Sequence, residues 1–270
     1  AINGAAFIIC SGWVHHVIRA NHNGVVYHFH SWIHVVHFTQ LFVGYIRFSE
    51  EHVHMSWHAG FDIDIALELC KRMDVECDVV AQDWDGIIPG LLANKYDVIV
   101  ASMFITEERK QQVDFTDPYY LAAMTHVVPM GSDIIEFTNE SLSGLIIGAQ
   151  SGTTQADFAE ATYPDAEVRL YPTQDEVNLD MASGRIDLQV GDMLPMLDWT
   201  TKSEDGACCE LGGEPITDPA FVGDGVGMAV RQEDDELREN LNNALAEMRA
   251  DGTYLEINNK YFEIDVYTMK

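Results

Sequence analysis

From Gly60 onward, apolar side chains recur with spacings that alternate between those of helices and those of strands. Residues 60–73 repeat them every three or four positions, which predicts an amphipathic helix. Residues 75–81 alternate apolar and polar side chains as a strand does, and residues 84–95 fit a short helix. The unbroken apolar run at 98–101 is typical of a strand buried on both faces. This alternation indicates an α/β fold with an open, mostly parallel sheet.

The same succession begins again in the second half of the chain. Three strands and two helices are predicted there, at residues 144–150, 153–163, 168–171, 173–184 and 185–192. A longer amphipathic helix follows, and the Asp-Gly pair at 251–252 is expected to end it. We therefore expect two similar α/β lobes, joined by short crossings near 121–127 and 221–225.

These patterns divide the chain into three parts. The first lobe takes residues 36–123 together with 222–270, and the second lobe takes residues 124–221. Residues 1–35 stand apart as an atypical histidine-rich segment that lacks the basic start of a secretory signal.

The first 59 residues differ sharply in composition from the rest. They hold ten of the 11 histidines but only two acidic and two basic residues, so the whole net charge of −29 arises after them. Several of the histidines would share a helix or strand face, which suits zinc or nickel: they are His30, His34, His37, His52, His54 and His58. No acid or cysteine is ordered around them, so we attribute the spacing to composition and predict no metal site.

The charge and the missing motifs exclude several classes of function. A net charge of −29 argues against a nucleic-acid partner, because a polyanion would be repelled over most of the surface. No apolar run approaches the ~18 residues of a membrane helix. The sequence also lacks a G-x-S-x-G elbow, a P-loop and a C-x-x-C pair, and His126 is the only histidine after Gly60. We therefore predict no catalytic residues and no cofactor.

Candidate binding groups stand where the predicted strands end, which is where ligands bind in open parallel sheets. Ser102 follows the strand at 98–101, and Arg109 comes seven residues later. An arginine offers a planar pair of donors that matches a carboxylate. The alternative is a surface arginine paired with Glu107 or Glu108.

Three further strand ends carry polar or aromatic groups. Thr153 and Thr154 stand at a predicted helix start. Two roles are open for them, binding an anion or serving as an ordinary helix cap. Asp192 would accept from an ammonium group, or be a solvated acid. Trp84 would supply a flat apolar wall, or pack in the core. Two anion-binding features and one acid, taken together, are complementary to a zwitterionic α-amino acid.

The five cysteines leave their pairing open. Cys70 is expected late on a helix and Cys77 on the next strand, a geometry that suits either a disulfide or two buried thiols. Adjacent Cys208 and Cys209 are not expected to bond to each other, because neighbouring residues are held awkwardly for a disulfide. Cys10 has no assigned partner.

At these residues the chain closely resembles the periplasmic polar-amino-acid-binding proteins of ABC importers (solute-binding protein family 3), nearest to the lysine/arginine/ornithine- and histidine-binding branch. The resemblance covers roughly three quarters of the chain, in order. The matching stretches include GFDIDIALELCKRM, WDGIIPGLLANKYDVIVASM, ITEERKQQVDFTDPYY, QSGTTQADF, GRIDLQVGD, FVGDGVGMAVR and LRENLNNALAEMRADGTYLEINNKYF.

The resemblance implies a type II periplasmic-binding-protein fold with two lobes, a two-strand hinge and the ligand in the cleft. Arg109 would grip the ligand carboxylate with help from Ser102 and the backbone of Thr153 and Thr154, while Asp192 would take the ammonium group. Trp84 would flank the ligand side chain, and Gln155 would lie on the second-lobe side. The resemblance also implies a disulfide between Cys70 and Cys77.

Two departures bear on the ligand. Phe104 stands where family members often have a serine, which removes a hydroxyl from the pocket. Tyr45 keeps the aromatic spacing of the first-strand loop, but the usual acid and prolines of that loop are missing.

The implied function is extracytoplasmic capture of a cationic or polar amino acid by a monomer, with delivery to a membrane ABC permease and no catalysis. The alternatives are an enzyme resembling cyclohexadienyl dehydratase and a sensor module of the same fold.

Overall fold

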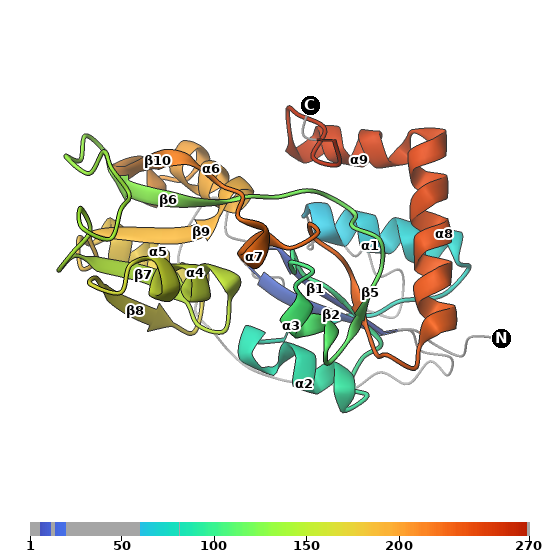
Figure 1. The fold of residues 1–270 in the computed structure, drawn as a ribbon. Helices are drawn as coiled ribbons and strands as arrows, with labels where there is room; N and C mark the ends of the chain where they lie inside the picture. The colour runs from blue at the N-terminus through green and yellow to red at the C-terminus, as the bar shows by residue number, and fades with distance from the viewer. Residues whose placement is uncertain (1–5, 12–13, 20–59, 81, 269–270) are drawn as a thin grey trace, which may run out of the picture.

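The computed structural model describes residues 6–11, 14–19, 60–80 and 82–268, and they form two sheets with helices around each (Figure 1). The six-stranded sheet has the order β3-β2-β1-β4-β11-β5 and the five-stranded sheet the order β10-β6-β9-β7-β8. The two sheets lie side by side, and the chain passes between them twice. The two-lobed α/β architecture expected from the sequence is therefore confirmed.

The first sheet is built around β4, which pairs in parallel with β1 and antiparallel with β11. Its strands are β1 (Ala6–Ser11), β2 (Val14–Arg19), β3 (Val79–Val80), β4 (Val98–Val100), β5 (Asp114–Phe115) and β11 (Ala229–Val230). Val98 and Val100 pack in one apolar cluster with α1, whereas Ile99 packs in another with α2. The apolar run at 98–100 is thus explained, because successive side chains of this strand enter cores on opposite faces.

Helices cover both faces of this sheet (Figure 1). They are α1 (Phe61–Arg72), η1 (Trp84–Gly86), α2 (Ile87–Leu92), α3 (Glu107–Lys110), α8 (Asp235–Asp251) and α9 (Thr253–Tyr261). The stripe predicted for α8 is buried at Leu237, Leu241, Leu245 and Met248. Gly252 ends α8 at a φ of 88°, a left-handed conformation that glycine adopts without steric cost, as the Asp-Gly pair predicted.

The second sheet contains β6 (Met124–Pro129), β7 (Ile146–Gln150), β8 (Glu167–Tyr171), β9 (Leu188–Asp192) and β10 (Cys209–Ile216). Its β7 is parallel to β8 and β9, whereas β6 runs antiparallel to β9 and β10. The surrounding helices are α4 (Thr154–Thr162), α5 (Gln174–Ala182), α6 (Met193–Lys202), η2 (Asp205–Cys208) and α7 (Pro219–Val222).

Each sheet is mixed, in place of the mostly parallel sheets that the pattern suggested. In the first sheet the parallel pair β1–β4 lies at the centre, between antiparallel strands. In the second sheet the parallel strands β9, β7 and β8 occupy one side, and the antiparallel strands β6 and β10, through which the chain enters and leaves the sheet, occupy the other. Within the described part of the strand predicted at 75–81, the pairing with β2 covers Val79–Val80.

Two crossings join the sheets, one between β5 and β6 and one between β10 and β11. They touch where Val226 pairs with Tyr120, and Val226 also pairs with Phe104 in the loop after β4. All five strands of the second sheet fall within residues 124–221, while β1 and β2, from the segment before residue 36, lie in the first sheet. The domain boundaries themselves stay a prediction. The two groups of three histidines, at 30–37 and 52–58, lie outside the described residues. In the part of the chain that the structure describes, none of the helices combines the length and apolar character of a membrane span.

Two disulfides join cysteines of the described residues. Cys70 near the end of α1 bonds to Cys77, with their Cα atoms 6.3 Å apart, as the resemblance implied. Cys208 also bonds to Cys209, which corrects the expectation that these neighbours stay apart. The chain changes from the η2 helix to the extended β10 strand between these two residues, and this change of direction brings their side chains together.

We expect the Cys70–Cys77 disulfide to stabilise the fold by restricting the unfolded chain. For a loop this short, Cys70→Ser with Cys77→Ser should lower the free energy of unfolding by about 2–3 kcal/mol, measured by urea titration. The pair Cys208→Ser with Cys209→Ser is the matched control, since it closes almost no loop. An unchanged midpoint for the first pair, with both thiols reactive in the native protein, would contradict the bond.

Candidate functional site

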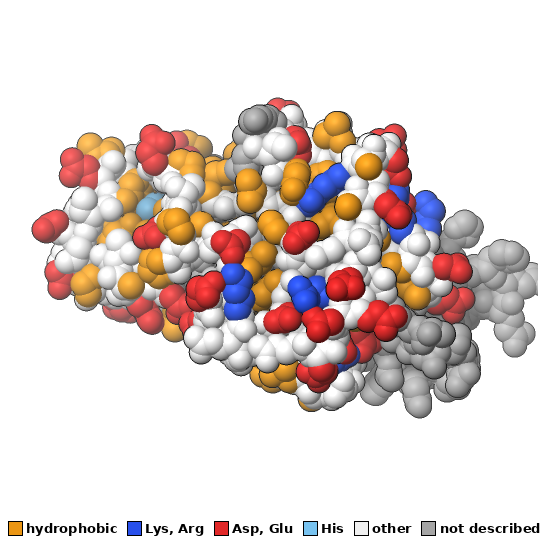
Figure 2. Space-filling view, turned by 45° about the vertical axis from the view of Figure 1, so that its right-hand side comes forward, with side chains coloured by type: hydrophobic (Ala, Val, Ile, Leu, Met, Phe, Trp, Pro, Cys, Tyr) orange, Lys and Arg blue, Asp and Glu red, His pale blue; other side chains and the backbone are white. Residues whose placement is uncertain are grey.

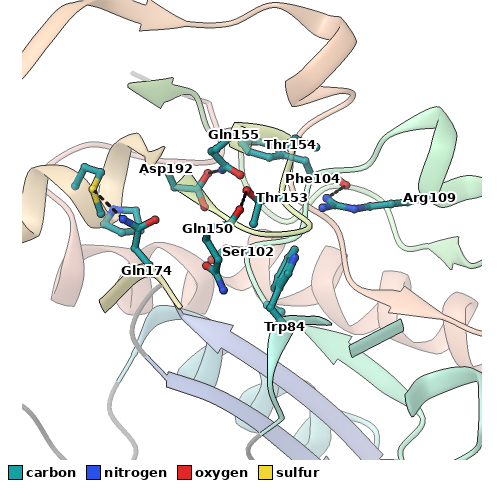
Figure 3. Close-up of a pocket in the computed structure, with 13 residues that line it drawn as sticks. Trp84, Ser102, Phe104, Arg109, Gln150, Thr153, Thr154, Gln155, Gln174 and Asp192 are labelled. Carbon is teal, nitrogen blue, oxygen red and sulfur yellow. Dashed lines mark hydrogen bonds between the residues drawn. The ribbon is translucent and has the colours of Figure 1, made fainter. Parts of the chain in front are cut away.

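A cavity lies between the two sheets, and eight of the nine predicted binding residues line it (Figure 3). Tyr45 is the ninth and lies outside the described residues. The eight are Trp84, Ser102, Phe104, Arg109, Thr153, Thr154, Gln155 and Asp192; Ala101, Gln150, Gln174, Pro195 and Met196 also line the cavity. The structure therefore brings the eight described candidates together around one cavity, and the candidates did not include Gln150, Gln174, Ala101, Pro195 and Met196.

The topology explains why residues so far apart in sequence meet here. The strands β4, β7 and β9 all end at this cavity, and the segments that follow them carry Ser102, Thr153 and Asp192. Parallel strands of one sheet end at the same edge, where loops and helix starts form a crevice. The first sheet contributes one wall and the second sheet the opposite wall.

Arg109 is the cationic group of the first wall. Its Nη1 donates to the Phe104 carbonyl oxygen at 2.9 Å, and its guanidinium carbon lies 5.4 Å from the centre of the Trp84 ring. Burial lowers the pKa of Arg109 to about 10, so the guanidinium stays charged at neutral pH. No carboxylate of the described residues lies within ion-pair distance of it, and Glu107 pairs with Lys110 instead. The surface-pair alternative for Arg109 is therefore not what the structure shows.

Ser102 is held from beneath by a buried carboxyl group. Its Oγ donates to Asp62 at 2.9 Å, and the Tyr119 hydroxyl donates to the same carboxyl at 2.8 Å. Ser102 has a φ of 49°, a left-handed conformation that turns the chain sharply after β4. Burial raises the pKa of Asp62 to about 6, although the Tyr119 and Ser102 hydrogen bonds oppose this shift.

Asp62 was missed from the sequence, because an acid in the first turn of a helix is ordinary. Only the tertiary fold brings it beneath the loop that follows β4.

The second wall presents the start of α4. Thr153 caps this helix, since its hydroxyl accepts from the Ala156 N–H at 3.3 Å and donates to the Gln150 carbonyl at 2.7 Å. Of the two roles that the sequence left open for Thr153, the helix cap is thus confirmed. The first N–H groups of a helix lack intrahelical acceptors, so Thr154 and Gln155 add positive potential beside the cavity.

Asp192 is the anionic group of the second wall. It ends β9, and the Gln155 amide donates to its Oδ1. Burial raises the pKa of Asp192 to about 7, while the Gln155 hydrogen bond and the charge of Arg109 lower it. This carboxyl group has no cation within ion-pair distance among the described residues, so a cationic guest would complete its environment.

Phe104 contributes mainly through its backbone. Its side chain is only 2% exposed and packs in the core, while its carbonyl oxygen orients Arg109. A ring at this position therefore does not fill the cavity, although it provides no hydroxyl.

The two walls touch each other beside the cavity. The Trp84 Nε1 donates to the Gly152 carbonyl oxygen at 2.8 Å, and the Ser151 hydroxyl donates to Asp85 at 3.2 Å. Gly152 has a φ of 66°, and a Cβ there would lie 3.3 Å from the Asp85 carboxyl. These contacts join the first sheet's η1 to the loop before α4, so the lobes are in a closed arrangement.

The model for bacterial extracellular solute-binding proteins, family 3, matches residues 50–264. The chain belongs to this family. The curated relatives of this solute-binding protein include the histidine-binding periplasmic protein of Escherichia coli strain K12, 43% identical over 210 residues (77% of this chain and 80% of the relative). The lysine/arginine/ornithine-binding periplasmic protein of the same strain is 39% identical, with the same coverage.

Solved structures agree in fold. An ancestral arginine-binding protein bound to arginine is 40% identical to the solute-binding protein, with a TM-score of 0.69 over 75% of this chain and 88% of that one. The ancestral amino acid-binding protein AncCDT-1, described as a precursor of cyclohexadienyl dehydratase, is 32% identical, with a TM-score of 0.67 over 76% and 86% of the two chains.

We expect Trp84→Phe to open the lobes, because it removes the N–H that bonds to Gly152 while keeping an aromatic ring beside Arg109. One hydrogen bond is worth about 1 kcal/mol, so the closed-to-open ratio should fall about fivefold. Small-angle X-ray scattering of the unliganded protein should then give a larger radius of gyration. The control is Leu92→Ala, at an exposed position of the neighbouring α2. Identical scattering from Trp84→Phe and the parent would contradict a latch at this contact.

Proposed function

We propose that this solute-binding protein captures a free α-amino acid between its two lobes and delivers it to a membrane ABC permease. The observation that supports this most directly is the presence of Arg109 and Asp192 in one cavity, from different sheets, each without an ion-pair partner among the described residues. A molecule that carries both a carboxylate and an ammonium group would satisfy both.

The contacts would divide by charge. The ligand carboxylate would meet the Arg109 guanidinium, the Ser102 segment and the first N–H groups of α4, all of which favour an anion. The ligand ammonium group would meet Asp192, whose other hydrogen bond comes from Gln155. Because these groups come from both walls, the ligand would stabilise the closed arrangement over the open one.

The relatives support the same reading. Those reported above are named for binding histidine, arginine, or lysine, arginine and ornithine, and two of the names are of periplasmic proteins. We accordingly propose an extracytoplasmic location, and a monomer that closes on one ligand without chemical change.

A second candidate is an enzyme resembling cyclohexadienyl dehydratase. Its support is the likeness to AncCDT-1 and the pKa of Asp192, about 7, which suits a general acid or base in a cavity. Incubation with prephenate separates the two candidates. An elimination enzyme would release phenylpyruvate, water and carbon dioxide, whereas a receptor would return prephenate unchanged.

We expect Arg109→Ala to abolish most of the amino-acid affinity, because it leaves the ligand carboxylate desolvated without its partner. Loss of one member of a buried charge pair costs about 2–5 kcal/mol, or at least thirtyfold in Kd by calorimetry. The control is Arg169→Ala, since Arg169 lies on β8 and pairs with exposed Glu167. Equal affinities for the parent and Arg109→Ala would refute the proposed carboxylate contact.

We expect amino-acid affinity to fall as the pH drops below about 7. The pKa of Asp192 is about 7 without ligand, and an ammonium group beside it favours the ionised form, so binding at lower pH must release a proton. Kd should therefore rise by up to tenfold per pH unit, and Asp192→Asn should bind weakly with little dependence on pH.

The pKa of Asp62 is about 6, so Asp62→Asn is the control that should keep the dependence. Calorimetry in buffers with different ionisation enthalpies measures the released proton directly. A Kd that stays constant between pH 5 and pH 8 would contradict the role of Asp192.

A further inference from the structure

The part of the cavity away from Arg109 ends in two glutamines of the second lobe. Gln150 ends β7, and Gln174 is the first residue of α5, after the cap residue Thr173. Figure 3 shows both side chains on the opposite side of Trp84 from Arg109. An amino acid gripped by Arg109 and Asp192 would extend its side chain toward this end.

Buried amides fix the position of Gln174. Its Nε2 donates to Gln189 Oε1 at 2.9 Å and to Asn178 Oδ1 at 3.2 Å, and it lies 3.9 Å from the Met196 sulfur. Asn178 is 3% exposed and Gln189 is fully buried. In Figure 3 the amide nitrogen of Gln174 turns toward that sulfur, away from the cavity, and the amide oxygen toward the side of Asp192.

Space around this amide is also restricted. Gly191 precedes Asp192, and a Cβ there would lie 2.9 Å from Met196 Cγ and 3.6 Å from Gln174 Oε1. A glycine at this position therefore lets the Gln174 amide and the Met196 side chain approach the strand end.

No ionisable side chain among the described lining residues stands at this end of the cavity. The uncharged lining also includes Ala101, Pro195 and Met196, and among the described lining residues the charged groups are Arg109 and Asp192, which the ligand backbone would occupy. Neutral amides offer dipoles and hydrogen bonds but no counter-charge. Against the described lining, a cationic or anionic ligand side chain would lose its hydration without gaining a counter-charge, whereas a carboxamide or ureido group would exchange hydrogen bonds for hydrogen bonds.

The geometry points to a receptor that selects amino acids with uncharged carboxamide or ureido side chains over those with charged side chains, with Gln174 as the selecting residue. This inference rests on the proposed function, because the ligand backbone must first be placed by Arg109 and Asp192. It departs from the cationic amino acids in the relatives' names and follows from the amide-lined end of this cavity.

Two pairs of nearly isosteric ligands test the selection. Citrulline and arginine differ in a ureido against a guanidinium group, and glutamine and glutamate differ in an amide against a carboxylate. Calorimetry with the parent protein should give a Kd for citrulline at least tenfold lower than that for arginine, and a Kd for glutamine at least tenfold lower than that for glutamate. Arginine or glutamate binding as tightly as its neutral counterpart would overturn the inference. If none of the four ligands and none of the other common amino acids binds, the proposed function is overturned instead.

The substitution Gln174→Glu tests the residue itself, because it adds a carboxylate where the amide stands. Arginine affinity should rise at least tenfold relative to citrulline. Gln111→Glu is the matched control, since it adds the same charge at an exposed position after α3 and should leave the ratio unchanged. An unchanged ratio in a folded Gln174→Glu variant would exclude Gln174 as the selecting residue. If that variant does not fold, Gln150→Glu applies the same test to the neighbouring amide, and the parent's ligand pairs still decide the selection.

Discussion

The site depends on two opposite charges held apart on facing walls of one cavity. Arg109 and Asp192 each lose hydration on burial, which lowers the pKa of the first and raises that of the second. Neither has an ion-pair partner among the described residues. Such an arrangement is costly in the empty protein, since a buried charge needs a partner or a hydrogen-bond network to offset its desolvation. A zwitterion supplies both missing partners at once. Binding it therefore removes the desolvation penalty of both charges, which favours a zwitterion over ligands that carry one charge or none.

The remaining structure serves to keep these charges in position. The Phe104 carbonyl and the Trp84 ring orient Arg109 from the first wall, and Gln155 orients Asp192 from the second. Asp62 holds the Ser102 turn from below. Among the described residues, the contacts that hold the walls together beside the cavity include that of Trp84 with Gly152. A ligand that touches both walls would add to the stability of the closed form, which is how a receptor couples ligand capture to a change of shape.

The sequence predicted those parts of the site that carry charge or cap a helix. Arg109, Asp192 and Thr153 were found because strand ends can be located by apolar periodicity, and ligands gather at such ends. Gln150 and Gln174 were missed, since the pattern of an uncharged amide carries no signal of its own; the amide Gln155 was named only through the family resemblance. The mixed order of the sheets was missed for a related reason: strand direction depends on how the crossings run, which local patterns do not specify. The Cys208–Cys209 bond depends on a local change from helix to strand that propensity alone did not reveal.

The most direct test of the central claim is the thermal stability of the protein with intact and blocked ligands. The melting midpoint would be measured with each common L-amino acid, citrulline and ornithine, and then with the N-acetyl and carboxamide derivatives of any that bind. A true ligand raises the midpoint by mass action. The account predicts that the intact zwitterion raises it, while blocking either the ammonium group or the carboxylate removes most of the effect. Derivatives that stabilise the protein as well as the parent amino acid would show that Arg109 and Asp192 do not meet around the ligand backbone.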